Sequence, residues 1–185
     1  MTETALQIAH EQGKAKDMSP EEAHEVARRV GLGSLKYFIL KVDPKKNMIF
    51  NPEESIDFNG NTGSFIQYTY ARIRSVLRRA EEQGLMIPNH LPSNLKISEK
   101  EVSLIALIAE YAEAVQEAAR SFSPAVIASY VYDLVKEYNQ FYHDFSILRE
   151  EDSRVQSFRL ALSSVVARTI ASGFTLLGIE MPERM

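Results

Sequence analysis

The sequence contains no cysteine, which excludes disulfide bonds and zinc sites built on thiolates. No apolar run approaches the roughly 20 residues that a membrane-spanning helix needs. Residues 1–6 show neither the basic nor the apolar region of a secretory signal. The four histidines lie on separate segments without a recognisable metal-binding or catalytic spacing. These absences predict a cytoplasmic protein with no membrane contact, no metal site and no catalytic centre of its own.

The length and composition are those of a globular protein. The chain has 185 residues, 45% of them hydrophobic, which is enough for one domain, or one domain with an extra lobe. The net charge of −4 means that any contact with nucleic acid must come from a local basic patch.

Residues 61–80 hold the clearest pattern. Wound at about 100° per residue, they gather an apolar side for packing on a core, with Tyr70 at its edge: Phe65, Ile66, Thr69, Ile73, Val76, Leu77 and Ala80. The opposite side is polar, with Arg74 flanking it: Gln67, Tyr68, Arg72, Ser75, Arg78 and Arg79. No acid lies between Ser64 and Ala80.

Two interpretations of this cationic face remain open. Its arginines either pair with acids of neighbouring helices in a solvated surface, or bind the phosphates of an RNA. Tyr68, in the middle of the face, favours the second interpretation, because an exposed aromatic ring can stack on an unpaired base.

The rest of the chain is predicted to be mainly helical. Residues 1–30 are predicted to form two short helices, the second of them capped by Ser19. Residues 31–34 break the pattern, 35–40 form a strand or a helix, and 48–50 form a short strand. Ser98 with Glu101 is a capping box before a helix whose buried stripe is Val102, Ile105, Ile108, Ala112, Val115, Ala119 and Phe122.

Two more helices complete an all-α bundle. One opens at Ser123 and Pro124 and buries Ile127, Val131, Leu134, Tyr138, Phe141 and Phe145. The other opens at Ser153 and buries Val155, Phe158, Leu162, Val165, Val166, Ile170, Phe174 and Leu177, with Gly178 as its C-cap.

Several blocks, in the same order along the chain, resemble the carboxy-terminal part of the arginyl-tRNA synthetases. They are residues 33–38 (Gly-Ser-Leu-Lys-Tyr-Phe), 50–54, 60–73 (Gly-Asn-Thr-Gly-Ser-Phe-Ile-Gln-Tyr-Thr-Tyr-Ala-Arg-Ile), 138–144 (Tyr-Asn-Gln-Phe-Tyr-His-Asp) and 176–185, which end in Glu-Arg-Met. The resemblance is collinear over nearly the whole chain.

The resemblance implies the all-α anticodon-binding fold of class I synthetases. Residues 64–185 would be the anticodon-binding bundle, and 1–63 the end of the catalytic body with a small helical and irregular junction lobe. It implies that the parent protein joins arginine to its tRNA using ATP. The ATP-site signatures of the family are absent, so the fragment should be inactive alone and need no cofactor. Its expected partners are the anticodon stem-loop of the arginine tRNA and the upstream catalytic domain. The alternative to an RNA-binding function is a helical protein-interaction module.

The resemblance also implies site residues. The family's anticodon-loop contacts correspond to Tyr68, Tyr142 and Met185, although Tyr142 borders a core stripe and Met185 could be an unattached end. We predict Arg72, Arg74, Arg78 and Arg79 as phosphate ligands, one or two of them pairing internally, and Asn139 and His143 as neighbours of Tyr142.

Overall fold

Several helices begin at a side chain that accepts a hydrogen bond from a free backbone N–H group. The computed structural model describes residues 18–49, 51–58, 60–85, 87 and 94–185. Its helices are α2 (Pro20–Leu40), α3 (Pro52–Ser55), α4 (Gly63–Glu82), α5 (Glu99–Ala109), α6 (Tyr111–Ser121), α7 (Pro124–Asp144), the 3-10 helix η1 (Ile147–Arg149) and α8 (Ser153–Leu176). The described residues contain no strand, which confirms the all-α prediction. Within them, no helix combines the length and apolarity that crossing a membrane requires.

Most of the observed helix caps agree with the capping residues predicted from the sequence. Ser19 and Ser98 both form capping boxes, with Glu22 and Glu101 respectively, as predicted. The helix α8 starts one residue earlier than expected, because the cap is Asp152, whose side chain accepts a hydrogen bond from the Arg154 backbone. Gly178, predicted as a C-cap, follows the last turn of α8 with φ of +66°.

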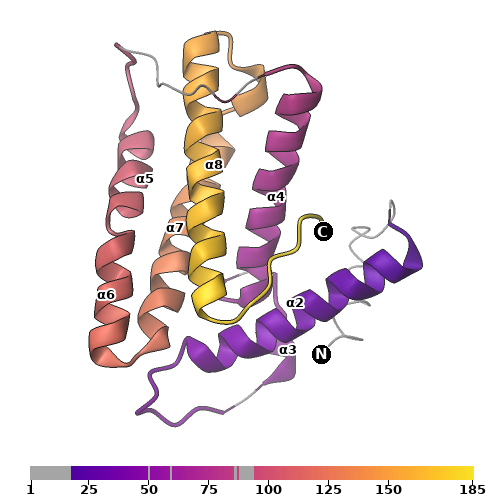
Figure 1. The fold of residues 1–185 in the computed structure, drawn as a ribbon, viewed down its shortest axis with the longest axis vertical. Coiled ribbons are helices and arrows are strands. Elements are labelled where there is room, and N and C mark those ends of the chain that lie inside the picture. The colour runs from indigo at the N-terminus through magenta and orange to yellow at the C-terminus, as the bar shows by residue number, and fades with distance from the viewer. Residues whose placement is uncertain (1–17, 50, 59, 86, 88–93) are drawn as a thin grey trace.

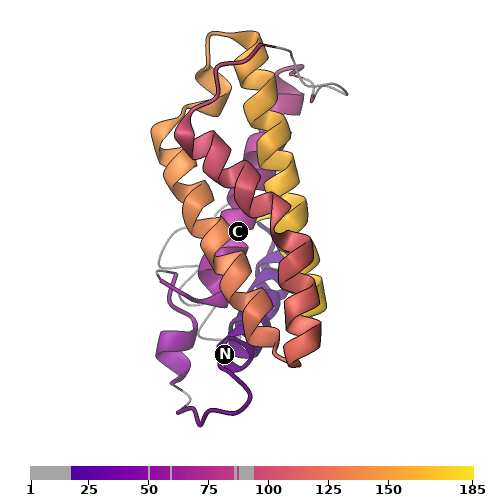
Figure 2. The same cartoon turned by 90° about the vertical axis from the view of Figure 1, so that its left-hand side faces the viewer.

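The long helices form an upright bundle that α2 crosses at one end. In Figures 1 and 2, α4, α7, α8 and the pair α5–α6 run along the long axis, and α2 lies across the end where α8 finishes. The yellow C-terminal tail, residues 177–185, returns between α2 and α4 (Figure 1). The core lies between α4, α7 and α8, where the predicted stripe of α7 is buried from Ile127 to Phe141.

The predicted helix break at residues 31–34 is wrong. Helix α2 continues through Gly31–Ser34, and 35–40 belong to the same helix. The glycine at 33 serves close packing: a Cβ there would lie 2.5 Å from Nε2 of Gln67. Residues 48 and 49 are not in a strand. Phe50 and the short helix predicted before Ser19 lie outside the described residues.

The predicted buried face of residues 98–122 is wrong in part. Val102, Ile105 and Phe122 are 48%, 41% and 88% exposed. Leu104 is buried instead, and Leu107, Ile108, Tyr111, Ala114, Val115 and Ala118 pack against the core. The segment is two helices, α5 and α6, separated at Glu110, so one continuous stripe does not describe it.

A buried ionic cluster joins three elements at the other end of the bundle. The Arg159 guanidinium of α8 bonds Glu101 of α5 at 2.8 Å and Glu150 at 2.6 Å. The Glu101 side chain is 2% exposed. Burial alone would raise the pKa of Glu101, but hydrogen bonds from Ser98 and Arg159 outweigh it and hold the pKa below its usual range.

We predict that Gly33→Ala destabilises the protein by about 1–2 kcal/mol, although Gly→Ala inside a helix normally stabilises by about 1 kcal/mol. The added methyl group would displace the Gln67 amide. Urea denaturation measures the change. In a Gln67→Ala background the same substitution should become neutral or stabilising. A stabilising Gly33→Ala in the otherwise unchanged protein would contradict the close crossing of α2 and α4.

We further predict that Arg159→Ala lowers the free energy of unfolding by about 3–5 kcal/mol, because it leaves the Glu101 carboxylate buried without its partner. The control is Arg120→Ala, which breaks an exposed pair with Glu117 and should change stability by less than about 1 kcal/mol. The difference in free energy of unfolding between wild type and Arg159→Ala should become smaller as the pH falls, because protonation removes the charge on Glu101. Equal losses in the two variants would assign no special role to the buried cluster.

Candidate nucleic-acid interface

The cationic side of α4 forms one wall of a hollow of about 490 Å³, here called the Arg72 hollow. Helix α7 and the tail supply other walls. Its lining residues are Met18, Tyr68, Ala71, Arg72, Ser75, Val76, Arg78, Arg79, Tyr142, Arg184 and Met185. The structure therefore brings together Tyr68, Arg72, Arg78, Arg79, Tyr142 and Met185, which the sequence had placed in three separate segments.

Arg72 lies between two tyrosine rings. Its guanidinium carbon is 4.7 Å from the ring centroid of Tyr68 and 5.3 Å from that of Tyr142. One N–H donates to the Asn139 side chain at 2.8 Å. Within the described part of the chain, no carboxylate pairs with Arg72, and its other four N–H donors have no acceptor. Among the described residues, the charge of Arg72 is therefore not neutralised by a carboxylate.

The ring of each tyrosine also packs against a second aromatic ring of the protein. Tyr68 meets the ring of Phe58 edge-on, with centroids 6.3 Å apart, and Tyr142 stacks on the buried Tyr138 at the same separation. Both tyrosines are half-buried. Tyr142 therefore packs at the edge of the core and also lines the hollow.

The other arginines of α4 differ in their partners. Arg74 does not line the Arg72 hollow; its Nε is 2.7 Å from the Glu183 carboxylate, which also accepts a hydrogen bond from Tyr70. Arg78 donates to the backbone carbonyl of Glu183 at 3.0 Å. The Arg79 side chain is exposed, and it makes no hydrogen bond or ion pair with another described residue. Arg74 is thus the internally paired member of the predicted set.

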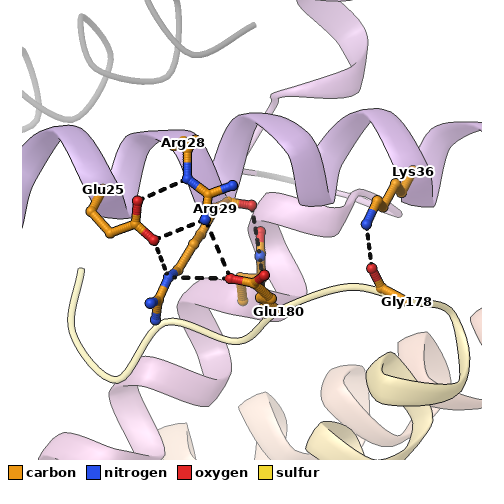
Figure 3. Close-up of polar contacts among 7 residues, drawn as sticks. Glu25, Arg28, Arg29, Lys36, Gly178 and Glu180 are labelled. Atoms are coloured by element: carbon orange, nitrogen blue, oxygen red, sulfur yellow. Dashed lines mark hydrogen bonds and ion pairs between the residues drawn. The ribbon is translucent and has the colours of Figure 1, made fainter.

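The tail is fastened to α2 as well as to α4 (Figure 3). The Glu180 carboxylate lies 3.5 and 3.4 Å from Arg28 and Arg29, and Lys36 donates to the Gly178 carbonyl. Hydrogen bonds from the same two arginines lower the pKa of Glu25 to about 2.

The side chain of Gln67, predicted on the polar face of α4, is fully buried. Its amide donates to the backbone carbonyl of Glu180 at 2.8 Å and to that of Arg29 at 3.3 Å. At the end of the tail, Met185 packs against the cluster of Ala27, Val30 and Ile56. Met185 is therefore attached to the protein and is not a loose end.

Besides Arg74, two predicted residues do not line the Arg72 hollow. His143, whose side chain is 88% exposed, bonds Asp144 and lines a different hollow with Phe65 and Lys136. Asn139 lines that second hollow too, and reaches the first only through Arg72. Met18 and Arg184 also line the Arg72 hollow and were not predicted as site residues. No sequence pattern marks Met18, whereas Arg184 directly precedes Met185.

The fold is an all-α bundle, and comparison with known proteins places it in the anticodon-binding class. Residues 66–185 match the DALR anticodon binding domain family, and the chain belongs to that family. It is 70% identical over its whole length to an arginine–tRNA ligase of Porphyromonas gingivalis and 54% identical to that of Flavobacterium psychrophilum. It spans about 31% and 30% of the length of these relatives.

Solved structures agree with this assignment. The Thermus thermophilus arginyl-tRNA synthetase superposes with a TM-score of 0.87 and 32% identity, covering 100% of this chain and 31% of that one. The arginyl-tRNA synthetase of Plasmodium falciparum, at 21% identity and a TM-score of 0.79, shares the fold; the match covers 100% of this chain and 32% of that one.

We predict that Met185→Ala lowers the free energy of unfolding by about 1 kcal/mol, because a half-buried methionine loses its packing on the Ala27, Val30 and Ile56 cluster. Arg184→Ala, which changes the exposed neighbour, should stay within about 0.5 kcal/mol. Thermal and urea unfolding of both variants tests this. Indistinguishable stabilities of Met185→Ala and wild type would mean that the tail end does not pack as described.

Proposed function

We propose that this chain is the tRNA-binding, anticodon-recognising part of an arginine–tRNA ligase. The longer protein would attach arginine to its tRNA in the cytoplasm, using ATP bound by an upstream catalytic part. In this proposal residues 64–185 are the anticodon-binding bundle and residues 1–63 the junction to the catalytic part. The separate small cluster of Ala27, Val30 and Ile56 supports such a junction. The chain alone would bind the anticodon stem-loop and catalyse nothing.

One observation carries the proposal: the guanidinium of Arg72 lies between the rings of Tyr68 and Tyr142, and no carboxylate of the described residues pairs with it. RNA loops offer unstacked bases and phosphates together, and proteins bind them with aromatic faces and arginine. Arg78 and Arg79 on the same wall extend the positive charge along α4. In this proposal Tyr68 or Tyr142 stacks on a loop base, while the arginines contact phosphates or a base edge.

The alternative of a protein-docking module fits this hollow less well. Protein interfaces have cores depleted of charge. The Arg72 hollow instead carries four arginines, and its aliphatic lining is limited to Ala71, Val76 and the two methionines. A folded RNA loop matches that composition better than an apolar protein surface does.

The test is binding of the chain to a synthetic anticodon stem-loop of an arginine tRNA, at fixed salt. Tyr68→Ala should weaken binding by about 1–3 kcal/mol, as loss of a base stack does. Arg72→Ala should weaken it too, and should reduce the slope of log affinity against log salt by about one if Arg72 contacts a phosphate.

Two controls make the test specific. Arg120→Ala removes an exposed arginine of α6 that lies outside the hollow and should leave affinity unchanged. A stem-loop with the same stem and a different loop sequence should bind more weakly. Absence of binding, or equal losses in Tyr68→Ala and Arg120→Ala, would reject the proposal.

A further inference from the structure

The side-chain amide of Asn139 joins α7 to α4 in a fixed orientation. Its nitrogen donates to the Val135 carbonyl and to the Thr69 hydroxyl, both at 2.9 Å. Its oxygen accepts from Arg72 at 2.8 Å. The Val135 carbonyl can only accept and the guanidinium can only donate, so a flipped amide would lose both bonds. The Thr69 hydroxyl donates to the Phe65 carbonyl and is left to accept from Asn139.

This arrangement orients Arg72 without neutralising it. A carboxylate at the same place would also accept from the guanidinium, but it would cancel the charge and could not donate to the Val135 carbonyl. An amide oxygen holds one N–H and leaves the positive charge and four donors for a ligand. By contrast, the Glu183 carboxylate pairs with Arg74, which does not line the Arg72 hollow.

We infer that Asn139 is a positioning residue for RNA binding: it holds the Arg72 guanidinium between the two tyrosine rings and does not contact the RNA itself. The inference rests on the proposed function for its RNA part. Asn139 is absent from the lining of the Arg72 hollow and faces the second hollow beside His143. An arginine side chain has many rotamers, and fixing it in advance removes an ordering cost from binding, worth about 3- to 10-fold in affinity.

A purely structural role is the competing explanation, because Asn139 also ties two helices together through Thr69. The two roles use different atoms of the amide, so they are separable. Thr69→Val keeps the side-chain shape and removes the hydroxyl acceptor, while the Asn139 nitrogen still bonds Val135 and its oxygen still bonds Arg72. Thr69→Val is therefore the matched structural control for Asn139→Ala.

The first measurement needs no RNA. Arginine side-chain NMR reports the order of the Arg72 Nε–H group, assigned by its disappearance in Arg72→Ala. Asn139→Ala should make this group markedly more mobile, whereas Thr69→Val should leave it ordered. An Arg72 group that stays equally ordered in folded Asn139→Ala would overturn the positioning role, and so would one that Thr69→Val mobilises to the same extent.

The second measurement is a double-mutant cycle with the arginine-tRNA anticodon stem-loop. Asn139→Ala should weaken binding about 3- to 10-fold, and the double variant Asn139→Ala/Arg72→Ala should match Arg72→Ala alone within about 2-fold, because both changes act through one guanidinium. Asn139→Asp, which pairs with Arg72 and cancels its charge, should lower affinity and salt slope as Arg72→Ala does.

The outcomes separate the two proposals. Multiplicative losses in the double variant would show that Asn139 acts independently of Arg72 and would reject the inference. If the wild-type chain does not bind the stem-loop, the proposed function fails, and the NMR result then decides the positioning role alone. Thermal melting of every variant confirms that the comparison is made between folded proteins.

Discussion

The amide of Gln67 joins segments that lie far apart in the sequence. It is fully buried and donates to backbone carbonyls of α2 and of the tail. Because a buried donor without an acceptor is costly, these two bonds fix how α2 and the tail meet α4. A Cβ atom on Gly33 would clash with this amide, and Gly63 lies against the backbone of Gly33. The crossing of α2 over the bundle therefore depends on a polar contact that only glycine permits.

The crossing of α2 and the path of the tail also shape the hollow on the cationic side of α4. With the tail held by Gln67, Lys36 and the Arg28–Arg29 pair, Arg184 and Met185 become walls of the Arg72 hollow. The polar contacts that hold the tail thus also shape the hollow beside α4. The hollow is a property of the assembled α2, α4, α7 and tail, although most of its charge comes from one helix.

Local patterns were sufficient for part of the fold. The stripe of α7 and the caps at Ser19 and Ser98 were predicted because periodicity and capping chemistry act within a few residues. The buried face of α5 and α6 was not, because Val102 and Ile105 form as good an apolar side as Leu104 and Leu107, and only the neighbouring helices decide between them. Gly33 was read as a helix breaker for the same reason: its partner, Gln67, is remote in sequence. At the site, Tyr68 and Arg72 were predicted from their side of α4, but the pairing of Arg74 with Glu183 and of Asn139 with Arg72 needed the tertiary structure.

The kind of acceptor that each α4 arginine meets explains how an acidic chain can present a positive surface. The net charge is −4, yet charges on a protein surface act mainly within a screening length of about 10 Å. Arg74 meets a carboxylate, which cancels its charge; Arg78 meets a backbone carbonyl and Arg72 an amide, which orient a guanidinium and leave it charged. The tail and α7 therefore determine which charges of α4 remain for a ligand. An isolated α4 would carry the same arginines without this distinction, so the Arg72 hollow and its charge pattern exist only once the tail and α7 are in place.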